Sequence, residues 1–234
     1  MLIADKKHFW TGAIMTIVFA GVLAYMFTPS FNGQNAFHAS DGLFNSIAKD
    51  STDYFPMLKE QNEQYAGHSV DVSLKLSGDM LSLASSILGK NNIQAEAVDG
   101  ALQVSGDLNN LVDSALVDAQ AMFNNNKEKL VQKYEMKGKK ALYVWWNILK
   151  ETEKQLKMQK DFKAAKFLSE VVKRGVEVGY NFYGVSAQSA QSRAGTLTFA
   201  LVFYVAYTLW WGYAIFFLFE GVGLEMSSGE KKEV

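Results

Sequence analysis

The chain contains no cysteine, and this absence removes a whole group of functions. Without thiols there is no disulfide, no thiolate zinc or iron–sulfur site, and no haem attached through a Cys-x-x-Cys-His motif. The same absence leaves the redox compartment open, because a cysteine-free chain can reside on either side of a membrane. Cysteine therefore neither supplies chemistry nor reports location in this protein.

Histidine, net charge and catalytic motifs are equally sparse. The three histidines, His8, His38 and His68, are widely separated and lack the spacing of metal ligands. A net charge of −1 creates no overall field that favours nucleic acid. No Gly-x-Gly-x-x-Gly, Walker, His-Glu-x-x-His or Gly-x-Ser-x-Gly motif is present. We therefore expect no catalytic residue, no metal, no cofactor and no nucleic-acid partner.

The chain does have two long runs without a charged side chain, residues 9–27 and 197–219. At a rise of about 1.5 Å per residue, each run can cross a hydrocarbon core about 30 Å thick as a helix. The composition between the runs is that of an ordinary soluble protein. The sequence thus predicts a membrane protein whose two transmembrane helices flank a water-soluble insert.

Lysines beside the first run set the predicted orientation. Lys6 and Lys7 precede this run, whereas residues 28–48 contain no lysine or arginine. Positive charge next to a first span marks the cytoplasmic side of a membrane. Residues 1–8 are therefore predicted to form a cytoplasmic amino terminus.

The second run then returns the chain to the cytoplasm, so the tail 220–234 is also expected there, in agreement with Lys231 and Lys232. This orientation makes the insert, residues 28–196, extracytoplasmic, and we expect it in the periplasm beside a bacterial inner membrane. Two alternatives stay open. The first run is also similar to a secretory signal peptide, and the insert contains lysine-rich stretches that fit the reverse orientation.

Small residues recur along the first run at a spacing that suits close helix packing. Side chains four residues apart lie on one face of a helix, and small ones let membrane helices approach each other. We expect this face to contact the second span or a partner subunit, although such stripes also occur by chance. The predicted packing face consists of Gly12, Thr16, Ala20 and Ala24.

Aromatic side chains crowd the second run, and several lie away from its ends. Aromatic belts at the two membrane surfaces do not explain these positions. Hydroxyl and indole groups in hydrocarbon need hydrogen-bond partners. We expect this helix to contact other protein, with a lone aromatic helix as the alternative. The predicted contact residues are Tyr207, Trp210, Trp211 and Tyr213.

The insert divides into an acidic and a basic part near residue 126. Residues 30–126 contain twelve acidic residues and four lysines, whereas residues 127–177 contain fourteen basic and seven acidic residues. So sharp a change in composition suggests two structural units. We therefore expect an acidic unit over residues 28–126 and a basic unit over residues 127–196.

The acidic unit has the pattern of a small α+β fold of order β-α-β-β-α, after two short helices. Apolar residues alternate with polar ones in the first strand, and Asp99-Gly100 is the residue pair of a type I′ hairpin turn. The short helices are expected over residues 41–49, capped by Ser40, and from Thr52 or Asp53 to Tyr65. The predicted strands cover residues 70–76, 93–98 and 101–105, and the predicted helices 79–88 and 108–123.

The basic unit is predicted to be helical. A helix over residues 127–137 is followed, after Gly138, by a long helix from near Lys139 to about Tyr183, read as a stalk or hairpin. Lysines every three or four residues give this helix a basic face. The face would dock on anionic lipid headgroups or an acidic partner, or it is simply a solvated surface. Its residues are Lys150, Lys154, Lys157, Lys160, Lys163 and Lys166.

The expected function is that of a non-enzymatic integral membrane protein that presents an extracytoplasmic interaction domain. It would be a subunit of a homo-oligomer or a larger membrane complex, with membrane lipid, itself or other membrane-protein subunits as partners. One alternative is a ligand-sensing module, because two spans around such a domain resemble the input half of bacterial transmembrane receptors. Only residues 220–234 follow the second run, so a sensor would signal through a partner. A second alternative is an accessory subunit of a redox or transport complex.

Overall fold

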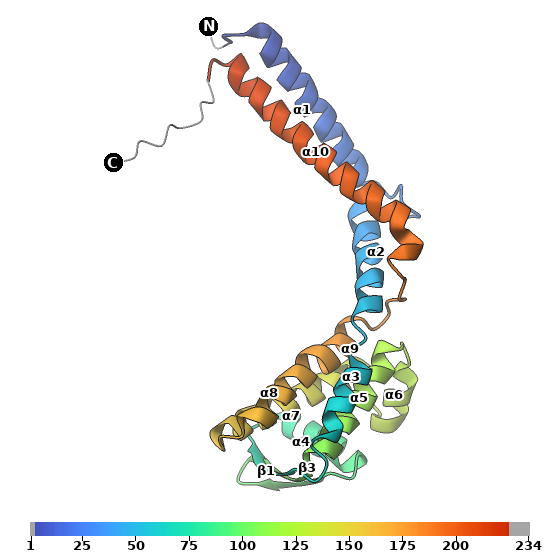
Figure 1. Ribbon diagram of the computed structural model, residues 1–234, viewed down its shortest axis with the longest axis vertical. Helices are drawn as coiled ribbons and strands as arrows, with labels where there is room; N and C mark the ends of the chain where they lie inside the picture. The colour runs from blue at the N-terminus through green and yellow to red at the C-terminus, as the bar shows by residue number, and fades with distance from the viewer. Residues whose placement is uncertain (1–2, 225–234) are drawn as a thin grey trace, which may run out of the picture. The chain divides into compact units, whose positions relative to one another are not determined.

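The computed structural model of the chain describes residues 3–224 (Figure 1). Most of the expected cytoplasmic tail, including Lys231 and Lys232, therefore lies outside the described residues. The chain forms two compact units, Met1–Ile47 together with Gln188–Val234, and Ala48–Ala187. Each unit is described by itself below.

The elements are mostly helices, with one small sheet. In chain order they are α1 (Lys6–Met26), α2 (Ala36–Ser51), α3 (Phe55–Glu63), β1 (Ser69–Leu74), α4 (Asp79–Lys90), β2 (Gln94–Val98), β3 (Ala101–Asp107), α5 (Leu108–Phe123), α6 (Lys127–Tyr134), α7 (Gly138–Met158), α8 (Phe162–Val171), the π-helical turn η1 (Val172–Val176), α9 (Glu177–Asn181), the 3₁₀ turn η2 (Gln191–Arg193) and α10 (Ala194–Gly221).

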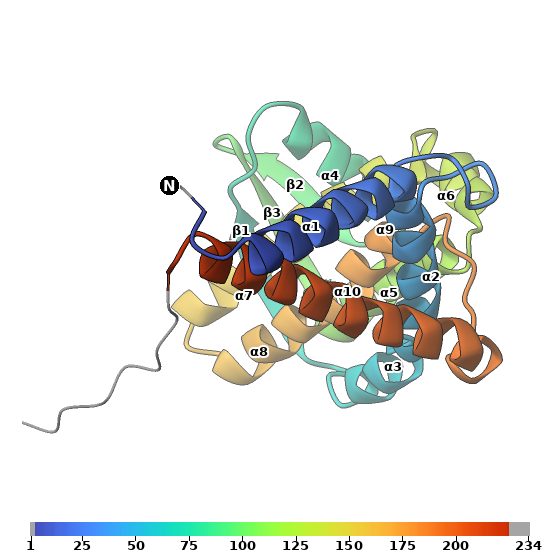
Figure 2. The same ribbon diagram turned by 90° about the horizontal axis from the view of Figure 1, so that it is seen from above.

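The first unit is built on an antiparallel hairpin of α1 and α10, which lie side by side in both views (Figure 1, Figure 2). Both helices are long and apolar enough to cross a membrane. Asp5 begins α1 by accepting hydrogen bonds from the backbone amides of Lys7 and His8. The two predicted apolar helices are confirmed as helices, each a few residues longer than its uncharged run.

The second unit contains the sheet, with strand order β1-β3-β2 and antiparallel pairing throughout. Asp99 and Gly100 have φ angles of +50° and +77° between β2 and β3, as a type I′ turn requires. The predicted hairpin and the α+β order of this region are therefore confirmed. Alternate residues of β1 and β3 are buried under the helices, including Val72, Leu74 and Leu102.

The short helices before the sheet begin at different residues from those expected. The helix α2 starts at Ala36, because the side chain of Asn35 accepts a hydrogen bond from the amide of His38 at 2.8 Å. Ser40 is thus inside the helix and is not its cap. The helix α3 starts at Phe55, whose amide donates to the side chain of Asp53 at 3.3 Å.

The stretch from Lys139 to about Tyr183 forms the hairpin that was one of its two interpretations, and the continuous stalk is wrong, because α7 does not extend to Tyr183. It ends at Met158, and the chain turns back through Lys160, whose φ is +65°. Asp161 then starts α8 by accepting a hydrogen bond from the amide of Ala164. The result is a helical hairpin of α7 and α8 in place of a continuous stalk.

One core joins the parts that the charge pattern separates. Buried residues on both sides of residue 126, among them Leu116 and Trp145, belong to the same hydrophobic cluster. The expected boundary at residue 126 falls in the turn between α5 and α6, inside the unit Ala48–Ala187. The charge composition of the chain therefore changes at residue 126, whereas the hydrophobic core continues across this position.

Candidate functional site

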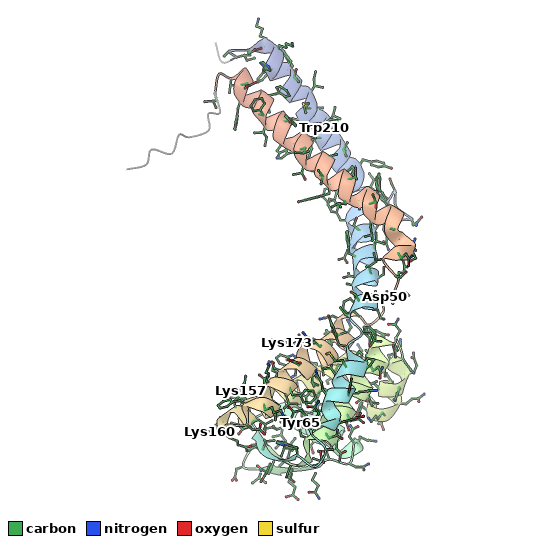
Figure 3. The ribbon with its side chains drawn as sticks, in the orientation of Figure 1. Asp50, Tyr65, Lys157, Lys160, Lys173 and Trp210 are labelled. Carbon is green, nitrogen blue, oxygen red and sulfur yellow. The ribbon has the colours of Figure 1, made fainter. Side chains whose placement is uncertain are left out.

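The six lysines of the predicted basic face lie on two helices and the turn between them. Lys150, Lys154 and Lys157 belong to α7, Lys160 lies in the turn, and the other two lie on α8. Lys157 and Lys160 occupy the free end of this helical hairpin (Figure 3). The expectation of a single helical face is wrong, but all six lysines remain at least partly accessible to solvent.

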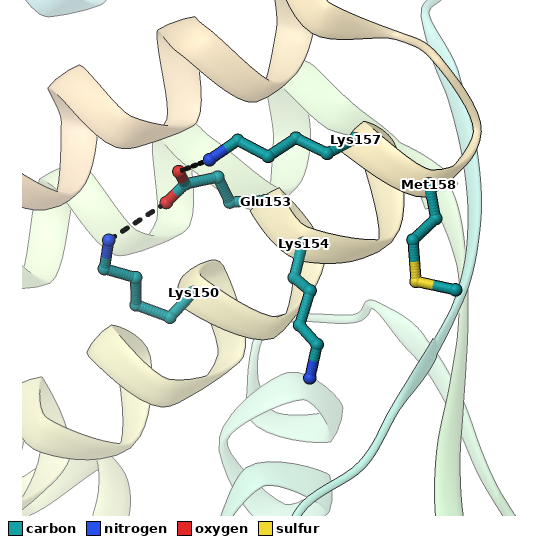
Figure 4. A pocket seen from close by; sticks show the side chains of 5 residues that line it. All are labelled: Lys150, Glu153, Lys154, Lys157 and Met158. Atoms are coloured by element: carbon teal, nitrogen blue, oxygen red, sulfur yellow. Dashed lines mark hydrogen bonds and ion pairs between the residues drawn. The ribbon is translucent and has the colours of Figure 1, made fainter.

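A shallow hollow of about 480 Å³ lies on α7 among the first three of these lysines. Its floor carries Glu153, whose carboxylate accepts from Lys157 Nζ at 2.6 Å and from Lys150 Nζ at 3.1 Å. Figure 4 shows both lysines reaching this carboxylate, whereas Lys154 points away from it. Met158 completes the lining.

Glu153 is only 5% exposed, so the ionisation of its carboxyl group depends on its partners. Burial by itself raises the pKa of Glu153, but the hydrogen bonds and charges of Lys157 and Lys150 outweigh this effect. The pKa of Glu153 therefore lies below its ordinary value. At neutral pH the group is a carboxylate clamped between two ammonium ions.

A second hollow, of about 310 Å³, lies where the chain enters and leaves the second unit. Lys49 is almost fully buried there and donates to the backbone oxygens of Val185 at 2.6 Å and Phe182 at 3.2 Å. Its ammonium also lies 4.9 Å from the ring centre of Phe123. Burial lowers the pKa of Lys49. The hydrogen bonds of Lys49 thus connect the beginning of the second unit with its last residues.

A buried polar cluster, not expected from the sequence, surrounds Asp118 on α5. Its carboxylate is inaccessible to solvent and accepts from Trp145 Nε1 at 2.8 Å, from the hydroxyl of Tyr134, and from Lys133 Nζ at 3.1 Å. Burial and the Asp118 charge raise the pKa of Tyr134. Asn91 donates to the Tyr134 hydroxyl and accepts from Lys133, so four helices meet at this cluster.

A signal for this cluster is present in the sequence. Asp118 falls between Ala115 and Met122 on the apolar face of α5, where a charge requires a partner. The three donors to Asp118 come from α6 and α7, so the charge was visible in the sequence but its partners were not.

The three histidines do not come together. His68 Nε2 lies 2.8 Å from Asp161 Oδ2, whereas His8 is paired with Asp5, and His38 belongs to the first unit. Among residues 3–224, no three side chains of histidine, aspartate or glutamate are grouped to hold a metal ion.

The predicted packing face of α1 is only partly used by α10. A Cβ atom added to Gly12 would lie 2.7 Å from the Leu218 nitrogen and 2.9 Å from the Ala214 oxygen. Thr16 is half-buried, but Ala20 and Ala24 are exposed.

The contacting residues of α10 are separated alternately by four and three positions, as in a left-handed helix pair. Residues spaced strictly by four therefore move away from this contact along α1, so Gly12 and Thr16 face α10 but Ala20 and Ala24 do not. The α10 positions at the contact are Tyr207, Trp211, Ala214, Leu218 and Gly221.

The predicted aromatic residues of the second run divide in a similar way. Tyr207 stacks on Phe19 with ring centres 4.0 Å apart and donates to the Phe19 oxygen at 3.1 Å. Trp210 Nε1 donates to the Met15 oxygen, also at 3.1 Å, on the α1 side of α10 (Figure 3). Trp211 also packs on Phe19. Tyr213 is 57% exposed and makes no such contact with α1 among the described residues.

Comparison of the chain with protein-family models, with curated proteins and with solved structures finds no match. The function is therefore inferred from this chain's own residues.

Proposed function

We propose that this protein is a non-enzymatic integral membrane subunit that anchors an interaction domain to a bacterial inner membrane. Both termini would lie in the cytoplasm and residues 28–196 in the periplasm. The domain would serve assembly with a second copy or with other membrane-protein subunits.

One observation carries the proposal: α1 and α10 cover each other only along one narrow seam. Their remaining surface is apolar in nearly every direction, as the exposure of Ile17 (70%) and Phe199 (67%) illustrates. Only 6% of the apolar window of each helix is buried. An exposed apolar surface of this extent is unfavourable in water and suits hydrocarbon.

The same hairpin supports assembly with further helices. Ala20 and Ala24, together with Gly21, leave a flat, small-residue surface on the part of α1 that α10 does not cover. Flat surfaces of this kind allow a further helix to approach closely in a membrane. Tyr213 adds an outward hydroxyl that a neighbouring helix can satisfy.

The polar clusters of the second unit support a structural role. Asp118 and Glu153, the two buried carboxylates, both have lysine partners within hydrogen-bond distance. Groups paired in this way rigidify a domain. The exposed surface is then the part of the domain available to partners.

Crosslinking in native membranes tests the proposal. A photoreactive residue would replace Ala24, with Val18 as the matched outward position on another face of α1. We expect Ala24 to capture a defined membrane protein, either a second copy or another subunit. A strictly monomeric particle in mild detergent, with no crosslink from either position, would contradict the proposal.

A further inference from the structure

The turn between α7 and α8 presents two large apolar side chains to solvent. Met158 ends α7 with 69% of its surface exposed, and Phe162 begins α8 with 65% exposed. Among the described residues of the second unit these are the most exposed large apolar side chains. They flank the turn Gln159–Asp161. We call this turn, together with Met158 and Phe162, the tip.

The tip is held in place by contacts with its own unit. Gln159 Nε2 donates to the Asp71 oxygen of β1 at 2.8 Å, and the Asp161 amide donates to the Leu156 oxygen at 2.9 Å. The Asp161 carboxylate lies 2.8 Å from His68 Nε2 and caps α8. The two apolar side chains are therefore displayed on an ordered turn, which lowers the entropic cost of binding.

Lysines outnumber carboxylates along this stretch, because residues 150–166 contain six lysines and three acidic residues. The carboxylate of Glu153 is paired with Lys157 and Lys150, and Asp161 Oδ2 shares a hydrogen bond with His68 Nε2. Among residues 3–224, no ion pair involves the last three lysines of the basic set. These lysines are Lys160, Lys163 and Lys166.

We propose that the tip docks on an anionic phospholipid surface, with Met158 and Phe162 entering the interface and the lysines meeting lipid phosphates. In a bilayer surface, acyl chains lie beneath anionic headgroups. Exposed apolar side chains with lysines close by are complementary to this arrangement. Lysine stems are also suited to such a boundary, because their methylenes pack on apolar groups while the charge stays in water.

The inference goes beyond the proposed function, since it assigns lipid as a further partner of the second unit and holds equally for a monomer. An acidic protein is the competing occupant. It would recognise the lysines, but it would need an apolar recess to gain from both Met158 and Phe162. The experiment therefore separates lipid from an acidic polypeptide.

The test uses the full chain in nanodiscs of phosphatidylcholine. Binding is measured as flotation of these nanodiscs together with vesicles. Vesicles of phosphatidylcholine alone are compared with vesicles of phosphatidylcholine and phosphatidylglycerol. We expect binding only to the anionic vesicles. Each lysine near such a surface contributes about fivefold in affinity, so the triple variant K160Q/K163Q/K166Q should bind about a hundredfold more weakly.

Matched variants control for charge and for folding. K127Q/K129Q/K140Q removes three exposed lysines elsewhere in the same unit and should leave vesicle binding within about twofold. M158S and F162S should each weaken binding by about tenfold. Circular dichroism identifies any variant that fails to fold.

The absence of cysteine provides a second readout. A polarity-sensitive dye on F162C should shift to the blue with anionic vesicles and be quenched by brominated lipid, whereas V98C should report no change. Equal binding to both vesicle types, unaltered binding of the triple lysine variant, or binding to polyglutamate in place of vesicles would each overturn the proposal. Monomeric protein in the crosslinking experiment would leave this result unaffected.

Discussion

At the scale of single residues, the stability of the second unit depends on charges that are buried with their partners. Asp118 is the clearest case, because three donors from two other helices converge on one inaccessible carboxylate. Removing one member of such a set leaves the others buried without a partner, which costs more than the cluster itself contributes.

The variant D118A should therefore lower the free energy of unfolding of the second unit by about 3 kcal/mol. The indole of Trp145 and the hydroxyl of Tyr134 would lose their acceptor. The measurement is the urea midpoint of the detergent-solubilised chain by circular dichroism. D113A, on the exposed side of the same helix, is the control and should change stability by less than about 0.5 kcal/mol. Equal effects of the two variants would refute a special role for Asp118.

Glu153 gives a prediction for pH. Because its pKa is lower in the folded chain than in the unfolded one, its contribution to stability is present above the ordinary glutamate pKa of about 4.3. That contribution disappears as the pH falls through the folded pKa. The difference in melting temperature between wild type and E153Q should be largest at neutral pH and should shrink between about pH 5 and about pH 3. The exposed E96Q is the control, and a difference independent of pH would contradict this prediction.

At the scale of elements, the α1–α10 hairpin is specified by shape more than by charge. Gly12 allows the backbones to approach, and Phe19 fills the space further along, against Tyr207 and Trp211. In hydrocarbon such packing and a few interhelical hydrogen bonds are the available attractions, because lipid tails are as apolar as the helices. A side chain at Gly12 should therefore separate the two helices.

The cysteine-free background allows this separation to be measured. A disulfide between A4C and G223C should form readily in the parent chain, because a Cβ at Gly223 would lie 3.1 Å from the Cβ of Ala4, and the added variant G12L should suppress it several-fold. G21L is the matched control, because no atom lies within 4 Å of a Cβ at Gly21. If G12L and G21L left disulfide formation equally efficient, the seam described here would be incorrect.

At the scale of the whole molecule, the proposed function rests on the direction in which the chain threads the membrane. Lys6 and Lys7 before the first apolar helix are the evidence for a cytoplasmic amino terminus. In the proposed orientation, the two helices would place residues 28–196 on the side of the membrane opposite to Lys6 and Lys7.

Single cysteines test this threading. In intact spheroplasts, V98C should react with a membrane-impermeant maleimide, whereas a cysteine in place of Ala4 should react only after the membrane is opened. Exposed positions are needed, and Val98 is half exposed on β2. Labelling of the Ala4 position alone in intact spheroplasts would reverse the proposed orientation.

Local patterns predicted the elements whose causes are local. The type I′ pair Asp99-Gly100 fixes the β2–β3 hairpin, and the apolar spacing of residues 108–123 fixes α5, because turn geometry and helical periodicity act within a few residues. The two charge-free runs likewise predicted both long apolar helices. Asp161 caps α8, but the apolar spacing that continues on both sides of it concealed the turn.

Only the tertiary structure decided which residues from distant segments meet. The partners of Asp118, the exposure of Met158 and Phe162 at a turn, and the single core across residue 126 all depend on how helices pack. The sequence by itself determined that this chain has two apolar helices, a β-hairpin and a basic stretch, since composition and short-range spacing are sufficient for those. The position of the basic stretch on a folded-back hairpin required the three-dimensional packing, because nothing within a helical turn specifies a contact between residues 93 positions apart, such as that of His68 with Asp161.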